Sequence, residues 1–161
     1  MGHARDHINI ASEASERRLH LVFAGDETSV RSALRTAMVA FSSMQLGPQF
    51  QGVVEIVLAE VLNNVVEHAY AEHGRGVIEI EADQLENALA FRITDDGRPM
   101  PEGCMPQGSP QDLDVPPDEL PEGGFGWYLI RRLTDRLGYQ RSANRNVLTF
   151  RVPLTAVSRL N

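Results

Sequence analysis

Apolar residues occupy every second position in several short stretches of this chain, a period that is typical of β-strands with one buried face. In residues 17–23, for example, Leu19, Leu21 and Phe23 are separated by His20 and Val22. Similar alternation predicts five strands, the second and third of which form a hairpin. The predicted strands lie within residues 17–23, 76–83, 88–94, 139–141 and 146–154.

Between these stretches, apolar residues recur every three to four positions, which predicts three helices. Asp26 or Thr28 can cap the first helix at its N-terminus, and Gly138 ends the third. A glycine C-cap at residues 73–74 ends the second. The predicted helices follow residue 26 as far as residues 47–48, run from residue 50 to residues 73–74, and run from about residue 122 to residue 138.

The order of these elements is strand, helix, helix, strand, strand, long loop, helix, strand, strand. It predicts an α+β fold, a two-layer sandwich in which a mixed, mainly antiparallel sheet is covered by three helices. We expect residues 1–16 to be a flexible N-terminus and residues 17–157 to form one domain.

Composition narrows the class of protein. The chain has 161 residues, 42% of them apolar, which suits a single domain with one core. Its net charge of −7 argues against direct binding of nucleic acid or of an acidic membrane, since both require a basic patch. The single cysteine, Cys104, excludes an internal disulfide and a cysteine-based zinc cage.

The chain has no apolar run of 18 residues, so we expect no transmembrane helix. Residues 1–18 also lack the apolar core of a signal peptide. A cytoplasmic location is therefore the expectation.

The predicted second helix carries a polar stripe on an otherwise apolar surface. Glu60, Asn64 and His68 recur every fourth residue and so lie on one face. Either the helix emerges into solvent at Glu60, or a carboxylate and a carboxamide face a pocket. Burying an ionised carboxylate is costly unless it is paired or coordinated, so the second interpretation implies a chemical role.

Two further segments carry candidate chemistry. Asp95, Asp96 and Gly97 end a predicted strand, where a carboxylate can accept a hydrogen bond from an exocyclic amine; the same triplet also occurs in ordinary turns. Residues 123–126, read GGFG, open the third helix, where backbone N–H groups favour a phosphate. A glycine-rich hinge is the alternative there. A P-loop and a Rossmann fingerprint are both missing from the sequence.

The stretch from residue 99 to residue 123 has no periodicity. It holds seven of the nine prolines together with six acidic residues. A loop of this length inside a small domain is more often a lid or binding loop than a plain connection. A disordered insertion is the alternative interpretation.

Taken together, these segments follow the order ExxxN on a helix, DxG at a strand end, a long loop, and GxG at a helix start. This order resembles the GHKL ATPase superfamily, which has the Bergerat-type nucleotide fold, over residues 17–154. Within it, the chain is most similar to the stand-alone anti-sigma-factor serine/threonine kinases of bacteria. The resemblance is carried by ExxxNxxxHAY (60–70), DDGRP (95–99), GGFGWYLIRRLTD (123–135) and NVLTFRVPL (146–154).

The resemblance implies a role for each segment. Asn64 would coordinate Mg²⁺ between the phosphates of ATP, and Glu60 would be the general base that takes the proton of a serine hydroxyl. Asp95 would accept the adenine amino group, and Gly97 would keep the ring pocket open.

The loop at 99–123 would be the ATP lid, although it offers no Lys or Arg between Arg98 and Arg131. His68 and Tyr70 are interpreted as structural. The remaining residues implied to bind the nucleotide are Gly124, Phe125 and Gly126, near the phosphates, and Asn146, the nearest match to a threonine that the superfamily has at the adenine site.

By the same resemblance, the substrate would be an anti-anti-sigma (STAS-domain) protein, and a sigma factor would be the second partner. Such kinases are often homodimers. Three other classes remain open. The chain could be an ATPase that drives a conformational cycle, a histidine-kinase catalytic fragment, or a non-catalytic binding module that uses ATP, or no nucleotide, to shape a partner surface.

Overall fold

The structure is a computed structural model that describes residues 11–15, 17–70, 76–107 and 125–160. Six strands and three α-helices make up most of it. The strands are β1 (Ala11–Ser15), β2 (Arg18–Ala24), β3 (Val77–Gln84), β4 (Ala88–Asp95), β5 (Asp135–Ser142) and β6 (Arg145–Pro153), and the helices are α1 (Glu27–Ser43), α2 (Pro48–Asn64) and α3 (Phe125–Leu133).

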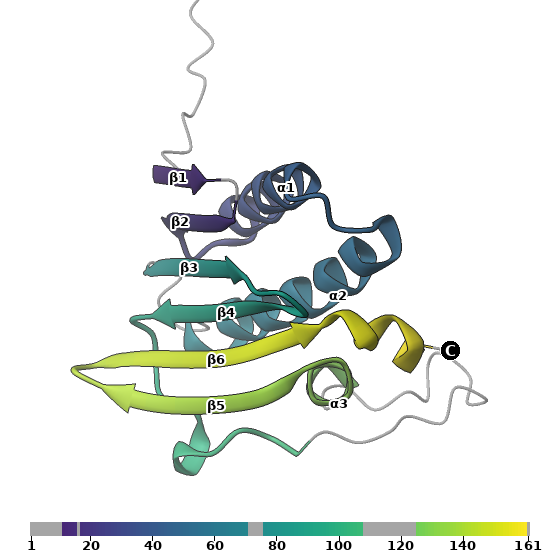
Figure 1. Ribbon diagram of the computed structural model, residues 1–161. Coiled ribbons are helices and arrows are strands. Elements are labelled where there is room, and N and C mark those ends of the chain that lie inside the picture. Colours follow the sequence, from purple (N-terminus) through teal and green to yellow (C-terminus); the bar gives the residue numbers. More distant parts are fainter. Residues whose placement is uncertain (1–10, 16, 71–75, 108–124, 161) are drawn as a thin grey trace, which may run out of the picture.

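The strands form one sheet in the order β1-β2-β3-β4-β6-β5, with the helices on one of its faces (Figure 1). The predicted α+β two-layer sandwich is therefore confirmed. Every strand pair in the described part of the chain is antiparallel, so the sheet is not mixed. None of the described helices is long and apolar enough to cross a membrane.

The helix starts follow local chemistry. Asp26 is the N-cap of α1, and its carboxylate accepts the Ser29 backbone N–H at 2.8 Å and the Ser29 hydroxyl at 2.9 Å. Pro48 opens α2, where its missing N–H leaves no intrahelical bond unmade. Both helices then bury one apolar face in the core.

The core lies between the two layers. The ring of Phe91 on β4 stacks on Phe150 of β6 at 5.0 Å and meets the edge of Phe41 of α1 at 5.8 Å. All three rings are buried. These contacts tie the first helix to the middle of the sheet, and aromatic pairs of this geometry stabilise a core beyond the area they bury.

The second helix does not end as a regular α-helix. A π-helical turn, Val65–Ala69, follows α2 directly, and Tyr70 caps it. The helix therefore ends earlier than predicted, and residues 73–74 lie outside the described residues.

Tyr70 fixes this helix end to the sheet through a packing unit that we call the Tyr70 clasp, formed by Gly25, Tyr70 and Gly76. A Cβ atom on either glycine would collide with the Tyr70 ring, which is 5% exposed. Gly25 also donates its N–H to the Gly76 carbonyl at 2.9 Å. The Tyr70 hydroxyl lies 2.5 Å from Asp96 Oδ1 and accepts the Asp96 N–H at 3.1 Å, in agreement with a structural role for Tyr70.

Two boundaries differ from the prediction. Residues 11–15, expected to be part of a flexible N-terminus, form β1 and pair with β2. The third helix ends at Leu133 and not at Gly138, because the chain enters β5 at Asp135 and pairs with β6. A bulge between Asp135 and Gly138 and the positive φ of Arg136 (50°) accompany this change of direction.

Candidate functional site

A cavity of about 730 Å³ opens between the end of α2, the ends of β4 and β6, and α3. Three of the residues predicted to bind the nucleotide line it: Asn64, Asp95 and Asn146. The first lies on α2, and the other two face each other across the β4–β6 pair. Also lining the cavity are Val61, Val65, His68, Ala69, Ile93, Arg98, Pro99, Met100, Pro101, Pro106, Trp127, Tyr139 and Leu148.

Asp95 is the buried carboxylate of this cavity, with 6% of its surface exposed. Its Oδ1 accepts the Gly97 backbone N–H at 2.9 Å and Asn146 Nδ2 at 2.8 Å. Burial raises the pKa of Asp95 above its ordinary value, and these two hydrogen bonds oppose part of that rise. The cavity thus holds a buried carboxylate that can accept a hydrogen bond from a ligand.

Asn146 is also buried and uses all of its hydrogen-bonding capacity. Its Nδ2 donates to Asp95 and, at 2.8 Å, to the Arg98 carbonyl. Its Oδ1 accepts the Tyr139 hydroxyl at 2.6 Å and Arg141 Nη1 at 3.0 Å. The side chain therefore joins β4, β5, β6 and the chain that leaves β4.

Asn64 is half-buried, and its Nδ2 is the buried side-chain nitrogen or oxygen that finds no hydrogen-bond partner among the described residues. A buried amide without a partner is costly, so such a group points to a ligand. Oxygen and nitrogen of an amide are assigned from the hydrogen-bond network, and none of the described residues holds Asn64 Nδ2 in place. An amide oxygen is a ligand that Mg²⁺ accepts, so Asn64 fits a magnesium site.

Glu60 lies one helical turn before Asn64, half-buried, beside the first turn of α3. A Cβ atom on Gly126 would collide with its carboxylate, so the glycine permits this approach. Burial, and then the nearby charge of Glu67, raise the pKa of Glu60 above its ordinary value. Glu60 itself is not among the residues that line the cavity.

The polar stripe predicted on the second helix is only partly turned toward the cavity. Asn64 and His68 line it, which places His68 nearer to the site than a purely structural interpretation implied.

Close packing requires a glycine at position 97, for a reason that the sequence did not indicate. A Cβ atom there would lie 2.6 Å from the Ala69 carbonyl oxygen, at the end of the π-helical turn. The next residue, Arg98, donates its N–H to that same oxygen at 3.0 Å. The structure thus gives Gly97 a place against the helix end, and its predicted role beside a nucleobase remains a prediction.

The structure describes only some of the residues that were predicted to lie near the phosphates of ATP. Gly124 and residues 108–123 of the predicted lid lie outside the described residues. Phe125 opens α3 and stacks on Tyr128 at 6.3 Å. Arg131 of α3 donates to the Pro106 carbonyl at 2.9 Å, which ties the first part of the loop to this helix.

Sequence reasoning did not identify several residues of the cavity wall, among them Trp127, Tyr139 and Met100. Trp127 lies in the predicted third helix, whose apolar residues were interpreted as core. The Tyr139 hydroxyl accepts the Met100 N–H at 3.0 Å, a contact between segments 39 positions apart that no local pattern reveals. The sequence placed Tyr139 in a strand, and its alternation with the polar Gln140 was the signal that its side chain could face inward.

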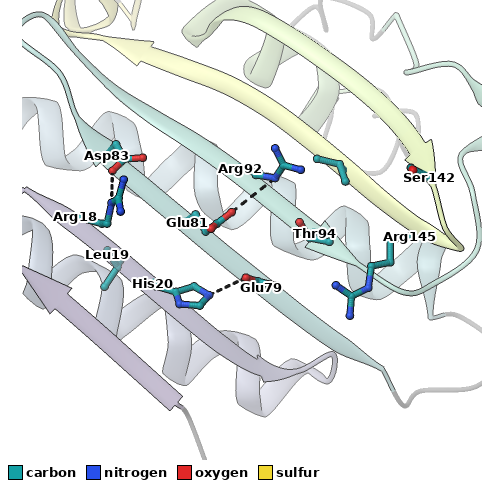
Figure 2. A pocket seen from close by; sticks show the side chains of 11 residues that line it. Arg18, Leu19, His20, Glu79, Glu81, Asp83, Arg92, Thr94, Ser142 and Arg145 are labelled. Carbon is teal, nitrogen blue, oxygen red and sulfur yellow. Dashed lines mark hydrogen bonds and ion pairs between the residues drawn. The ribbon is translucent and has the colours of Figure 1, made fainter.

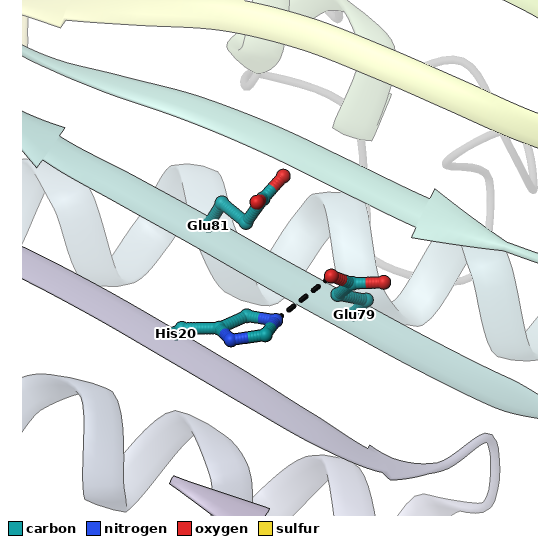
Figure 3. A group of neighbouring side chains, drawn as sticks. All are labelled: His20, Glu79 and Glu81. Atoms are coloured by element: carbon teal, nitrogen blue, oxygen red, sulfur yellow. Dashed lines mark hydrogen bonds and ion pairs between the residues drawn. The ribbon is translucent and has the colours of Figure 1, made fainter. Parts of the chain in front are cut away.

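A second hollow, also of about 730 Å³, lies on the sheet face opposite the helices (Figure 2). Within it, His20 Nε2 lies 2.8 Å from Glu79 Oε1, and Glu81 is 3.7 Å from Arg92. The ligand atoms of His20, Glu79 and Glu81 lie within 4.8 Å of one another (Figure 3). Arginines of neighbouring strands already pair with Glu81 and Asp83. None of the predicted site residues that the structure describes lines this hollow.

Comparison with known proteins identifies relatives. The sequence profile of the histidine kinase-like ATPase domain matches residues 23–152. The serine-protein kinases RsbW of Bacillus cereus (strain AH820) and Bacillus anthracis are each 32% identical over 96 residues, which is 59% of this chain and 59% of each relative. Blue-light-activated histidine kinase 2 of Erythrobacter litoralis is 26% identical over 109 residues, 65% of this chain and 28% of that protein. The matches thus span less than two thirds of either relative.

Proposed function

Because the chain belongs to the family of histidine kinase-like ATPase domains, we propose that it binds Mg·ATP in the cavity beside α2 and transfers the γ-phosphate to a serine or threonine of a partner protein. One observation carries this proposal. Asn64, whose amide nitrogen has no hydrogen-bond partner among the described residues, and the buried acceptor Asp95 line the same cavity. A carboxylate with a raised pKa, Glu60, lies one helical turn from Asn64.

At the nucleobase end, Asp95 accepts the 6-amino group of adenine. The apolar side chains of the cavity, such as Leu148 and Ile93, provide contact for the flat ring.

At the phosphate end, Asn64 would hold Mg²⁺, which would supply the positive charge that phosphoryl transfer requires. The first backbone N–H groups of α3 would donate to the phosphates, and Gly126 lets this helix end approach Glu60. Glu60 takes the proton of the attacking hydroxyl. Its raised pKa brings it closer to the operating pH, where a general base is most effective.

The similarity to the serine-protein kinases RsbW favours a protein substrate over water. We propose an anti-anti-sigma (STAS-domain) protein as the substrate, a sigma factor as the second partner, and a homodimer as the working form. The chemistry of Glu60 and Asn64 is the same in an ATPase, so the acceptor is what the experiment has to distinguish.

The first experiment measures Mg·ATP binding by calorimetry for the wild type and Asp95→Asn. We expect clear binding by the wild type and at least a tenfold loss in the variant, because an amide nitrogen facing the amino group replaces an acceptor with a donor. A folded wild type that binds no nucleotide would contradict the proposal and favour the non-catalytic module.

The second experiment separates binding from transfer. Glu60→Gln should bind Mg·ATP like the wild type and lose about 10²- to 10⁴-fold in phosphotransfer, the range for a general base. Asn64→Ala should lose the magnesium dependence of binding. Full phosphotransfer by Glu60→Gln would remove Glu60 as the base, and phosphate release without a labelled protein would favour the ATPase.

A further inference from the structure

The Asn146 amide is held in one orientation by groups on β5. Arg141 can only donate hydrogen bonds, and its Nη1 lies 3.0 Å from Asn146 Oδ1. The Tyr139 hydroxyl donates to the same oxygen at 2.6 Å. Rotating the amide by half a turn would place its nitrogen against the guanidinium and its oxygen against the Asp95 carboxylate, so both ends oppose the rotation.

This orientation decides which oxygen of Asp95 meets a ligand. Within the described part of the chain, the hydrogen bonds to the Asp95 carboxylate, from Gly97 and Asn146, both go to Oδ1. Oδ2 is therefore the acceptor that remains for the cavity. If the amide were free to turn, Asn146 would present an oxygen to the carboxylate and push it out of this position.

The same hydroxyl also reaches the start of the predicted lid. Tyr139 accepts the Met100 N–H at 3.0 Å while it donates to Asn146. Arg141 likewise donates to the Gly97 carbonyl at 2.7 Å. Two side chains of β5 thus hold the strand end, the turn after it and the Asn146 amide in one network.

We propose that Tyr139 and Arg141 are positioning residues for nucleobase selection: by locking the Asn146 amide, they aim Asp95 Oδ2 at the 6-amino group of a purine. This inference rests on the proposed binding of ATP in this cavity. It assigns a role to these two side chains through their contacts with Asn146 and with the backbone around the site.

The ionisation of Asp95 is consistent with this role. Burial raises its pKa and so does the neighbouring charge of Asp96, whereas the bond from Asn146 and the charge of Arg141 lower it. Arg141 and the hydrogen bond from Asn146 therefore favour the charged carboxylate, which accepts a hydrogen bond more strongly than the protonated form.

The test compares two probes on the full chain, Mg·ATP and the magnesium complex of purine riboside triphosphate, which lacks the 6-amino group. The wild type should bind ATP about ten- to a hundredfold more tightly, the range for a hydrogen bond to a charged group. In Tyr139→Phe and in Arg141→Gln, this preference should fall at least about fivefold, because affinity for ATP should fall more than affinity for purine riboside triphosphate. Tyr128→Phe, which removes a hydroxyl outside the network, should keep the full preference.

The outcomes separate this inference from the function on which it rests. A wild type that binds neither probe contradicts the proposed function. A wild type that binds both equally, or variants that weaken both probes by the same factor, overturn the positioning role, since general damage to the cavity would act on both ligands alike. Arg141 is exposed, so its variant tests the idea even if Tyr139→Phe does not fold.

Discussion

At the scale of single residues, the carboxyl group of Glu60 lies where its ionised form is disfavoured. Burial raises the pKa of Glu60 most, and the charge of Glu67, about two helical turns later, raises it further. Since the folded protein holds this proton more tightly than the unfolded chain does, the contribution of Glu60 to folding stability falls as pH rises through its pKa. The protein thus keeps a destabilised base in place, which is typical of a site used for chemistry.

We expect Glu67→Gln to move the acid limb of the phosphotransfer rate to lower pH. Removing the neighbouring negative charge lowers the Glu60 pKa, so the base is ionised at a lower pH. The measurement is a pH profile of single-turnover transfer. Glu55→Gln, an exposed change on the same helix, is the matched control and should leave the profile unchanged. An acid limb that does not move in Glu67→Gln would show that another group sets it.

At the scale of elements, the second helix is held by the Tyr70 clasp, which has no room for additional atoms. A Cβ atom on Gly76 would collide with the Tyr70 ring and lie 2.6 Å from Asp96 Oδ1. On the same helix, Gly52 has open space within 4 Å of its would-be Cβ. Alanine at these two positions should therefore change the free energy of unfolding in opposite directions.

Gly76→Ala should lower the free energy of unfolding by about 1–3 kcal/mol or more, because overpacking displaces the Tyr70 ring. Gly52→Ala should raise it by about 0.5–1 kcal/mol, because alanine favours an exposed helix interior. Urea unfolding of both variants checks this. An unchanged midpoint for Gly76→Ala would mean that the clasp relaxes and does not anchor the helix.

Elements with a long, regular period could be predicted from the sequence, and elements set by distant partners could not. The alternation of Leu89, Phe91 and Ile93 gave β4 because one face of that strand is buried throughout. β5 was predicted too short and α3 too long, because Leu137 fits a helical stripe equally well. Only pairing with β6 places Asp135 and the following residues in the sheet.

The candidate site divides in the same way. Asn64 and Asp95 were found because motifs mark them, and both line the cavity. Tyr139 and Arg141 were not found, because their value lies in contacts with Asn146 across the β5–β6 pair, and a sequence pattern carries no such information. The π-helical turn was missed because its residues also suit an α-helix.

At the scale of the whole molecule, the two faces of the sheet differ in chemistry. The face covered by helices holds the core and the cavity, whereas the opposite face carries crossing ion pairs such as Arg18–Asp83 (2.7 Å) (Figure 2). Exposed pairs of this kind contribute about 0–1 kcal/mol each. Stability therefore depends mainly on the covered face, and a ligand in its cavity should stabilise the entire domain.

Mg·ATP at about 100 times its dissociation constant should stabilise the fold by about 2.7 kcal/mol and raise the Tm by roughly 5–10 °C for a domain of this size. The measurement is a thermal melt with and without nucleotide. Asp95→Asn should lose most of this shift, and Arg18→Gln on the opposite face should keep it. Equal shifts in all three proteins would mean that the nucleotide binds elsewhere.

The π-helical turn at Val65–Ala69 also makes the gene unequally sensitive to length changes in this stretch. Because a π-helical turn holds about one residue more than an α-helical one, losing one codon would let the helix continue with regular α spacing and leave the later residues in nearly the same direction. Gaining one codon would turn every later residue by about 100° around the axis. Asn64 precedes the turn and would stay in place, whereas Tyr70 follows it and would leave the two glycines that enclose its ring. A one-codon deletion within these five codons should therefore be better tolerated than a one-codon insertion.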